Sequence, residues 1–384
     1  MPDKALPDGW RLIELGQTCR LPERQVRPVE FANYEFYVGL ENIEADTGRI
    51  IEYKKVSDAN LKSSKFPFDD SCILYGKLRP YLNKVAIPQT TGICSTDILP
   101  LYPISKIVLK EYLYYFLRTP FFVKVATEKS TGANLPRISP GSLLGITIPL
   151  PPIEAQREIT DVLAKADKIK QKREQAIELA SLIVRSAFLK IFGNPRAGSK
   201  GWPTVELGKI FKLSSGRTRP SEMKSSPENE FVFPVFGGNG IIGYSDRYFV
   251  ERPAIVLGRV GQYCGNVHIS AGKSWISDNA LYSKEFLRED VNLDFLGTCV
   301  SLLDLNKLQK RSGQPLITQA IVHSLEIPLP PESSQRRFGD FVARIRTVSA
   351  RQRESAARMN ELYWSITHKA FKGELGIAKI APHT

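Results

Sequence analysis

The sequence Ile148-Pro149-Leu150-Pro151-Pro152 occurs a second time as Ile327-Pro328-Leu329-Pro330-Pro331, and a long helix-like segment follows each copy. At a constant offset of 179 residues the two segments match in the pairs Gln156/Gln335, Ile159/Phe338, Val162/Phe341, Ala166/Ile345, Ile169/Val348, Ala180/Met359, Ile183/Leu362 and Phe192/Phe371. Upstream, the stretches 9–16 and 201–208 share a Gly-Trp start and a Glu-Leu-Gly end. Self-similarity at a fixed period indicates a duplicated structural unit. We therefore predict that the chain contains one fold twice.

The segment behind each proline signature is predicted to be one long helix. Glu154–Phe192 contains no Gly or Pro, is rich in Ala, Glu, Lys, Gln and Leu, and places apolar residues at spacings of three and four. We expect it to form a helix of about 39 residues, about 58 Å long, that ends at Gly193-Asn194-Pro195. The second copy predicts a helix at about Glu332–Phe371, with Gly373 beyond it.

Each predicted helix carries an apolar stripe that it cannot bury alone, so the other helix is the obvious partner. The chain between them is long enough to bring them side by side antiparallel. We expect a coiled coil with a pseudo-two-fold axis and the globular parts at its opposite ends. Arg173 and Ala176, and likewise Gln352 and Ser355, interrupt the stripes at matching places. The predicted seam residues are Ile159, Val162, Ala166, Ile169, Ile183, Phe338, Phe341, Ile345, Val348, Met359, Leu362 and Ile366.

Outside the helices the pattern indicates a mixed fold. A strand-like run at Val85–Ile87 precedes a Leu-, Tyr- and Phe-rich stretch at 106–125, which predicts one or two helices broken near Pro120. In the second half, Phe231–Phe233 and Ala254–Leu257 are again strand-like. We predict an α+β fold with a first globular domain at 1–150, a helix at 151–195, a second globular domain at 196–330, and a helix with a tail at 331–384.

Composition narrows the class of protein. The 384 residues are 42% hydrophobic and 24% charged, which is ordinary for a globular protein. The net charge of +13 favours an anionic partner, most simply nucleic acid. Five scattered cysteines without a C-x-x-C pair favour reduced thiols over disulfides or a metal site. Because we find no signal peptide and no stretch of ~18 apolar residues, we expect a cytoplasmic protein without a membrane partner.

The duplication indicates how such a chain could meet DNA. B-form DNA has antiparallel strands, so two modules related by a two-fold axis present equivalent faces to two half-sites. The two modules of this chain are not identical in sequence. The predicted target is therefore bipartite and asymmetric, with two different half-sequences separated by a spacer of untouched base pairs.

With these features the chain resembles the specificity (S) subunit of Type I restriction–modification enzymes. The resemblance rests on the Ile-Pro-Leu-Pro-Pro sequence, on Gln156 or Gln335 four residues after its last proline, and on the long helix that follows. It also rests on the duplication, which extends from Trp10 to about Gly376. The family commonly has a Leu and a Glu-Gln pair after the prolines, where this chain has Ile-Glu-Ala-Gln and Glu-Ser-Ser-Gln.

The resemblance implies a set of roles and partners. The globular parts would be target recognition domains, each reading one half of a bipartite site in double-stranded DNA. The helices would bind two methyltransferase (M) subunits, and motor-nuclease (R) subunits would join through them. The chain would then be no enzyme by itself and would have no cofactor, since S-adenosylmethionine, ATP and Mg²⁺ belong to the partner subunits. A specificity subunit of a related fused restriction–methylation enzyme is the alternative within this class.

A glycine turn in each half carries most of the candidate DNA contacts. Tyr75–Lys84 resembles a recurrent segment of recognition domains, and Leu257–Asn266 is its counterpart. Arg and Lys suit phosphates and guanine, whereas Tyr, Asn and Gln add contacts to phosphates or base edges. The alternative for each residue is a charged or polar position in a solvated β-turn. The candidate DNA-binding residues are Lys77, Arg79, Tyr81, Lys84, Arg137, Arg217, Arg259, Gln262, Lys273 and Asn279.

Other functions are disfavoured by the sequence. Gly238–Gly243 matches G-x-G-x-x-G, but no helix pattern follows it, as a dinucleotide site requires. Asp46 with Glu52 and Lys54 could hold Mg²⁺ for a nuclease, although the second half has no counterpart. We find no P-loop and no Asn-Pro-Pro-aromatic methyltransferase motif. The strongest competitor is a duplicated coiled-coil scaffold that never binds DNA, which leaves the charge and the cationic loops unexplained.

Overall fold

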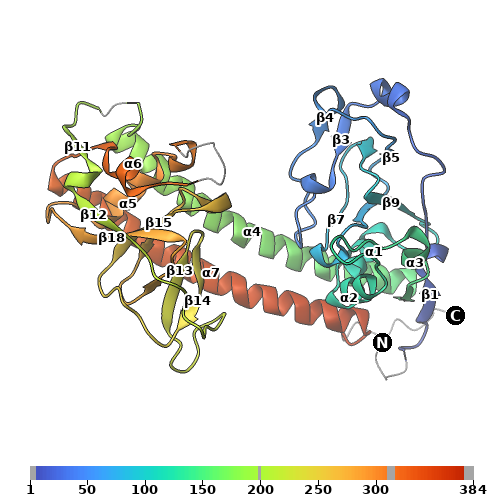
Figure 1. The fold of residues 1–384 in the computed structure, drawn as a ribbon. Coiled ribbons are helices and arrows are strands. Elements are labelled where there is room, and N and C mark those ends of the chain that lie inside the picture. The colour runs from blue at the N-terminus through green and yellow to red at the C-terminus, as the bar shows by residue number, and fades with distance from the viewer. Residues whose placement is uncertain (1–5, 198–199, 309–315, 376–384) are drawn as a thin grey trace. The chain divides into compact units, whose positions relative to one another are not determined.

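The computed structural model describes residues 6–197, 200–308 and 316–375 (Figure 1). The chain divides into two compact units. Unit 1 comprises residues 1–172 and 356–384, and unit 2 comprises residues 173–355. Each unit therefore contains one globular part together with a portion of each long helix.

The strands of unit 1 form two four-stranded sheets and one separate pair. In chain order they are β1 (Arg11–Glu14), β2 (Cys19–Arg20), β3 (Phe36–Val38), β4 (Lys54–Lys55), β5 (Phe66–Phe68), β6 (Ile73–Gly76), β7 (Val85–Ala86), β8 (Gly92–Cys94), β9 (Ile98–Pro103) and β10 (Thr147–Leu150). The sheets have the orders β2-β9-β6-β7 and β4-β3-β8-β5. The separate pair is antiparallel and joins β1 to β10, with Arg11 opposite Leu150.

Short helices connect the strands of unit 1. The α-helices are α1 (Lys110–Leu117), α2 (Pro120–Glu128) and α3 (Pro140–Leu144), so the predicted break near Pro120 is confirmed. Proline tolerates the first turn of a helix because its missing N–H would have no partner there. The 3-10 helices are η1 (Leu15–Gln17), η2 (Pro28–Asn33), η3 (Leu40–Asn42), η4 (Val56–Asp58) and η5 (Pro80–Leu82).

Unit 2 has a corresponding set of elements. Its strands are β11 (Thr204–Glu206), β12 (Phe211–Ser215), β13 (Phe233–Gly237), β14 (Gly240–Ser245), β15 (Ala254–Gly258), β16 (Val267–Ser270), β17 (Trp275–Ile276), β18 (Ala280–Phe286) and β19 (Glu326–Pro328). They form sheets of order β12-β18-β15-β16 and β14-β13-β17 and the pair β11-β19. Its helices are η6 (Leu207–Lys209), η7 (Gly261–Tyr263), α5 (Leu293–Ser301), η8 (Leu305–Leu308) and α6 (Gln319–His323).

The two units share their strand connections as well as their sequence signature. In unit 1 β3 and β8 are parallel neighbours with Tyr37 beside Ile93, and in unit 2 β13 and β17 are parallel with Val235 beside Trp275. The proline signature itself supplies β10 and β19. Each of these strands pairs antiparallel with the strand that follows the Gly-Trp stretch, which explains why the two signatures recur together.

Two long helices follow the proline signatures, α4 (Ile153–Phe192) and α7 (Glu332–Phe371). Their bounds agree with the predicted ones to within one residue. Gly193 follows α4 with φ +86°, and Gly373 lies beyond α7 with φ +70°. These left-handed conformations suit glycine at a helix C-terminus. In Figure 1 the two helices are the green and red ribbons.

One glutamine in each copy fixes the start of the long helix to its globular part. Gln156 donates through Nε2 to the Pro151 carbonyl (2.9 Å) and accepts through Oε1 from the Leu109 amide (2.8 Å). Gln335 does the same with Pro330 (2.8 Å) and Asn292 (3.0 Å). Leu109 and Asn292 are the N-cap residues of α1 and α5. Both glutamines are buried, so these bonds are shielded from water.

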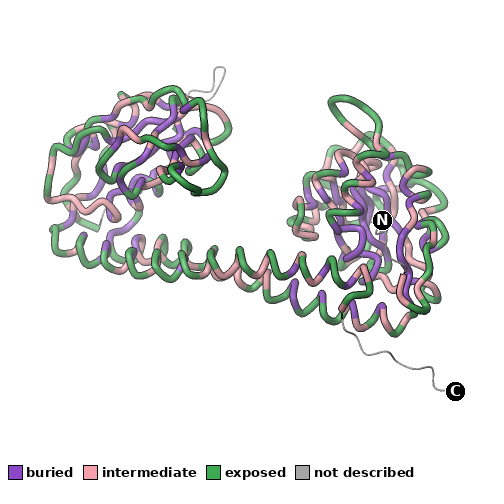
Figure 2. Tube along the Cα trace, turned by 90° about the horizontal axis from the view of Figure 1, so that it is seen from below, coloured by how far each residue is buried: buried purple, intermediate pink, exposed green. Residues whose placement is uncertain are grey.

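Aromatic side chains occupy the core of each unit where the helices meet the globular part. In unit 2 the rings of Phe188 and Phe192 each lie 5.5 Å from that of Phe338 on α7. In unit 1 the ring of Phe371 on α7 packs against Tyr112 (5.3 Å) and Phe116 (5.1 Å) of α1. Figure 2 shows buried residues gathered inside each globular part, whereas much of each long helix is exposed.

Two segments of unit 2 differ from a simple strand or helix pattern. Phe231–Phe233 was predicted as a strand, but β13 begins only at Phe233, and Phe231 instead pairs with Glu228 in an isolated bridge. The G-x-G-x-x-G match at 238–243 spans the turn and most of strand β14, so no helix follows its glycines. Among the described residues, no helix is both long and apolar enough to span a membrane.

Candidate nucleic-acid interface

The predicted DNA-contacting segments form corresponding loops in the two units. Recognition loop 1 (residues 77–84) connects β6 to β7, and recognition loop 2 (residues 259–266) connects β15 to β16. Each contains one 3-10 helix. The Gly76 amide donates to the Lys84 carbonyl, and the Gly258 amide donates to the Asn266 carbonyl, both at 2.8 Å. Both loops are therefore closed by the same backbone bond.

A second pair of backbone bonds holds the start of each loop. In unit 1 the Lys77 amide donates to the Asp97 carbonyl (2.8 Å), and in unit 2 the Arg259 amide donates to the Asn279 carbonyl (2.9 Å). The Lys77 and Arg259 carbonyls accept from Ile138 (3.0 Å) and Ile317 (3.1 Å), which are 179 residues apart. Lys77 and Arg259 are thus structurally equivalent positions on rigid supports, as a binding surface requires.

Loop 1 presents charged and aromatic side chains. Lys77 and Arg79 are partly exposed, and Tyr81 is 48% exposed. Arg79 and Asn83 adopt positive φ values of 52° and 48°, which non-glycine residues rarely do. Such strain is typical of functional loops, where the surrounding structure overrides local preference.

Lys84 does not fit its predicted role as a DNA contact. Its Nζ donates to the Leu40 carbonyl at 2.7 Å, and partial burial lowers its pKa. The side chain therefore ties loop 1 to η3 behind it. Arg137 is also engaged within the protein, since its Nη2 lies 2.8 Å from the Asp97 carboxylate and its Nε donates to the same group at 3.0 Å. The sequence shows these charges but not their partners within the fold.

The candidates of unit 2 lie on several elements, and Lys273 follows β16 at the end of the sheet opposite loop 2. The Arg259 guanidinium donates to Ser215 Oγ at the end of β12 (3.3 Å). Arg217 lies over the Phe249 ring (4.4 Å) and Lys273 over the Tyr248 ring (5.4 Å), which is favourable cation–π geometry. Gln262 is exposed on η7. Asn279 contributes its backbone carbonyl to loop 2 and is half-buried.

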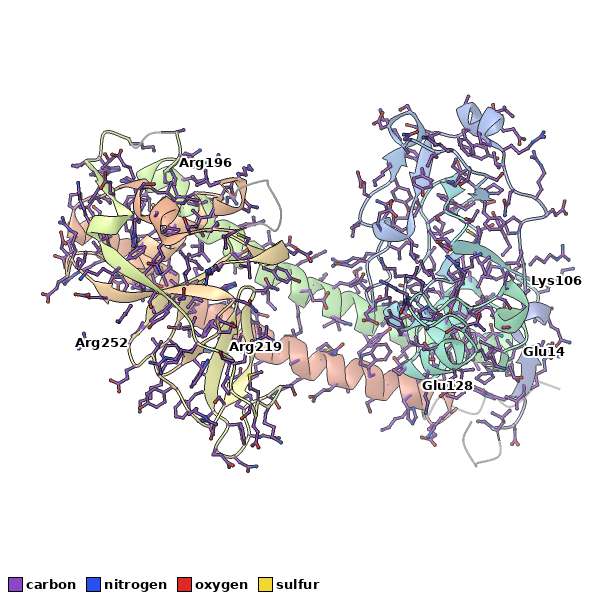
Figure 3. The ribbon with its side chains drawn as sticks, in the orientation of Figure 1. Glu14, Lys106, Glu128, Arg196, Arg219 and Arg252 are labelled. Atoms are coloured by element: carbon purple, nitrogen blue, oxygen red, sulfur yellow. The ribbon has the colours of Figure 1, made fainter. Side chains whose placement is uncertain are left out.

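Some surface residues of unit 2 were not singled out from the sequence. Arg219 and Arg252 are exposed cations of unit 2, and Figure 3 labels both. Asn266, the last residue of loop 2, donates through Nδ2 to Oδ1 of Asn239 at 2.9 Å. The sequence signal for Asn239 is its glycine-rich turn at 237–240, which also overlaps the match to a dinucleotide motif.

The predicted helix seam is only partly buried. Ile159, Ala166 and Phe338 are buried, while Phe341, Ile345, Met359 and Ile366 are half-buried. In contrast, the predicted seam residues Val162, Ile169, Ile183, Val348 and Leu362 are between 38% and 54% exposed. For these five the assignment to the seam was wrong.

Each long helix has a row of buried apolar residues next to the row of exposed ones. Leu163, Val342 and Tyr363 are buried, and each is one residue from a predicted seam position. One residue along a helix rotates the side chain by about 100°, since a turn has about 3.6 residues. The helices therefore carry two adjacent apolar rows, and sequence periodicity could not decide which row faces inward. We call the exposed set, Val162, Ile169, Ile183, Val348 and Leu362, the outer apolar row.

Polar residues meet where the apolar stripes are interrupted. In unit 2 the Arg173 guanidinium of α4 donates to Ser355 Oγ of α7. In unit 1 Lys170 Nζ of α4 lies 5.4 Å from the ring centre of Tyr363 and 6.0 Å from that of Trp364 on α7. The interruptions at Arg173 and Ser355 thus coincide with a specific contact between the helices.

The residues considered for catalysis have other partners. Glu52 accepts from Asn42 Nδ2 (3.2 Å), and Lys54 pairs with Glu41 (3.4 Å). Across the described part of the chain, we find no group of three or more His, Cys, Asp or Glu side chains that could hold a metal ion. All five cysteines are buried and free, and burial raises the pKa of Cys72 to about 12.

Comparison with known proteins identifies related sequences. The sequence profile of the family described as "Type I restriction modification DNA specificity domain" matches residues 7–179 and 199–353, once in each half of the chain. The EcoDI specificity subunit of Escherichia coli is 28% identical over 192 residues, covering 49% of this chain and 42% of that subunit. The EcoKI specificity subunit of Escherichia coli K12 is 25% identical over 311 residues, covering 71% and 67%. The chain thus spans less than half of the first relative.

Solved structures share the fold over nearly the whole chain. The S subunit of a Type I restriction–modification system from M. genitalium superposes with a TM-score of 0.56 at 15% identity, covering 94% of this chain and 96% of that one. A chain solved in a study of assembly and conformational transition of the type I R-M system gives a TM-score of 0.52 at 24% identity, covering 97% and 100%. At this identity the likeness concerns the fold.

Proposed function

The chain belongs to the family of Type I restriction–modification DNA specificity proteins, and on that premise we propose that it is the sequence-reading subunit of a restriction–modification complex. Each unit reads one half of a bipartite, asymmetric site in double-stranded DNA. The observation that carries the proposal is the pair of equivalent loops, which have the same backbone clamps but different exposed side chains. The net charge of +13 supports an anionic partner.

The long helices each contribute a portion to both units. We propose that α4 and α7 run antiparallel as a coiled coil, which gives the duplicated chain a pseudo-two-fold axis. In unit 1 the first half of α4 contacts the last part of α7, through Lys170 and Tyr363. In unit 2 the last part of α4 contacts the beginning of α7, through Phe192 and Phe338. These contacts support opposite directions for the two helices.

The outer apolar row supports two equivalent partners. Ile169 and Val348 are exposed at positions 179 residues apart, and so are Ile183 and Leu362. Exposed apolar side chains that recur on one face mark a protein interaction site. We propose that each copy of the row binds one methyltransferase (M) subunit and that motor-nuclease (R) subunits join through these. The chain itself then directs catalysis without performing it, and S-adenosylmethionine, ATP and Mg²⁺ bind to its partners in the cytoplasm.

The test is to map N6-methyladenine across the genome of cells that make this chain with its methyltransferase, and of cells that lack only this chain. We expect methylation to disappear at one bipartite, asymmetric motif in the second strain. An unchanged methylome with an active methyltransferase would contradict the proposal and favour a scaffold. Methylation that is lost without this chain but is carried out by a fused restriction–methylation enzyme would place the chain in that related class.

A further inference from the structure

A pair of asparagine side chains lies on the surface of unit 2 beside recognition loop 2. Gly238 and Asn239 form the turn of the β13–β14 hairpin, whose last paired residues are Gly237 and Gly240. Asn266 ends loop 2, and its Nδ2 donates to Asn239 Oδ1 at 2.9 Å. Asn239 is exposed and Asn266 half-buried, so the free sides of both amides can meet a ligand.

Both ends of this pair are held by the surrounding backbone. The backbone of Asn266 makes two bonds. Its carbonyl accepts from the Gly258 amide (2.8 Å), and its backbone N–H donates to the Tyr263 carbonyl (3.1 Å). A Cβ at Gly238 would lie only 3.6 Å from the Gly258 Cα, so the hairpin turn rests directly on the base of loop 2. A Cβ at Gly258 would lie 2.1 Å from the Tyr263 carbonyl oxygen, which leaves room only for glycine. The two amides are therefore pre-positioned.

Stability alone does not account for two amides in this arrangement. A hydrogen bond between exposed groups replaces bonds to water and contributes little to folding. Its consequence is orientational, because it fixes which polar atoms point outward. After the bond is made, Asn239 Nδ2 remains a donor and Asn266 Oδ1 remains an acceptor. Exchanging oxygen and nitrogen in both amides reverses the bond and still leaves one donor and one acceptor.

A donor beside an acceptor complements one base edge in the major groove. Adenine presents the N7 acceptor and the N6 amino donor, whereas guanine presents two acceptors at N7 and O6. Cytosine offers a donor and thymine an acceptor with a methyl group. We propose, on the basis of the proposed function, that Asn239 and Asn266 together recognise an adenine in the half-site read by unit 2.

The neighbouring residues supply the charge that an amide pair lacks. Arg259 begins the same loop and is partly exposed, with its guanidinium near the end of β12. Arg217 is exposed over the Phe249 ring. Cations at the border of a polar base-reading group suit the phosphates on either side of the base.

Unit 1 has different residues at the equivalent positions. Lys84 corresponds to Asn266, because both carbonyls accept from the loop-closing glycine amide. Glu41 corresponds to Asn239. Glu41 lies three residues after Val38, whose carbonyl accepts from a serine amide, and Asn239 lies three residues after Phe236, whose carbonyl does the same. Lys84 is bound to the Leu40 carbonyl, and Glu41 pairs with Lys54. The amide pair thus belongs to one half-site, as an asymmetric target requires.

The test selects preferred sequences from duplexes randomised in both half-sites, using the full chain assembled with its methyltransferase. The wild-type complex should prefer adenine at one position of the unit 2 half-site. Asn239→Ala and Asn266→Ala should each lower the preference for adenine over guanine there by about tenfold or more. Both variants should keep the unit 1 half-site unchanged, which shows that they fold and assemble. Asn60→Ala, an exposed asparagine of unit 1, is the matched control and should alter nothing.

A modified base makes the test specific to the atoms involved. With Asn266 Nδ2 donating to Asn239 Oδ1, Asn239 Nδ2 is the donor that meets N7. Replacing that adenine with 7-deazaadenine removes the N7 acceptor and should weaken wild-type binding by about tenfold, but should not weaken binding of Asn239→Ala further. If both variants kept the wild-type selectivity, the amide-pair proposal would be overturned. The proposed function would still stand, because the wild-type complex would show two preferred half-sites. A uniform loss of affinity at all positions would also overturn the amide-pair proposal. A wild-type complex without any sequence preference would overturn both.

Discussion

Recognition loops 1 and 2 have the same backbone and different chemistry. Both are closed by a 2.8 Å bond from a glycine amide, and both are held at their first residue by two further backbone bonds. Loop 1 exposes Lys77, Arg79 and Tyr81, whereas loop 2 joins one arginine to a surface rich in amides. The comparison teaches that duplication preserved the support and left the exposed side chains free to diverge. Such divergence is what two different half-sites demand.

The largest expected effect tests the buried aromatic core of unit 2, where α4 and α7 meet. Phe338→Ala removes a fully buried ring between Phe188 and Phe192 and should lower the free energy of unfolding of unit 2 by about 3–5 kcal/mol. Urea denaturation followed by tryptophan fluorescence measures it in a chain in which Trp10 and Trp364 of unit 1 are replaced by phenylalanine, so that only Trp202 and Trp275 of unit 2 report. The exposed Leu362→Ala should change it by less than about 0.5 kcal/mol. Equal losses in the two variants would disprove the burial pattern of α7.

The next prediction asks whether the repeat is equivalent in energy as well as in geometry. Gln156→Ala and Gln335→Ala each leave buried backbone groups without partners, and each should lower the free energy of unfolding of its own unit by about 1–3 kcal/mol. The exposed Gln175→Ala on α4 serves as the control and should have almost no effect. Urea denaturation of both variants measures the losses. If only one of the two variants lost stability, the hydrogen bonds of Gln156 and Gln335 would not be energetically equivalent.

A third prediction compares two lysines of loop 1, one whose side chain is unbound in the described part of the chain and one bound within the protein. Lys77→Ala should weaken DNA binding about tenfold for all sequences and reduce the slope of log affinity against log salt by about 1. Lys84→Ala should leave the salt slope unchanged, because Lys84 is bound to the Leu40 carbonyl. Fluorescence anisotropy across a salt series with the assembled complex measures both. A lower slope in the Lys84 variant would show that this lysine reaches DNA.

The smallest expected effect concerns a buried acid present in only one unit. Desolvation raises the pKa of Asp167 in unit 1, although nearby Arg118 opposes the shift. A carboxyl whose folded pKa exceeds its unfolded value stabilises the fold at low pH, and that stability is lost as pH rises through the folded pKa. Asp167→Asn should therefore give a small increase in thermal stability at pH 7 that shrinks towards pH 4.

Unit 2 and a surface acid provide the contrast for this pH effect. The residue 179 positions after Asp167 is Arg346, which pairs with Asp294, so unit 2 has no acid at this position. Asp161→Asn, on the exposed side of α4, should show no pH-dependent gain in melting temperature. A gain of the same size in the Asp161 variant would mean that general charge, and not burial of Asp167, sets the effect.

Much of the architecture was predictable because its signals are local. Gly193 and the proline signature bound α4, and a run without Gly or Pro propagates a helix between them, so its bounds were predicted to within one residue. The repeat was visible because paired residues such as Gln156 and Gln335 make the same bonds and are therefore constrained alike. The candidate site was less predictable, since Lys84 and Arg137 look free in sequence and are held by Leu40 and Asp97 in space.

The sequence by itself determined the duplication, the two long helices, the mixed fold and the position of the two loops, because these depend on periodicity, on helix-breaking residues and on register along the chain. Only the tertiary structure decided which apolar row of each helix faces inward, since neighbouring rows such as Leu163 and Val162 are equally apolar and differ only in their partners. It also brought Asn239 next to Asn266. Pairings between distant residues are set by chain folding and packing, which no local pattern records.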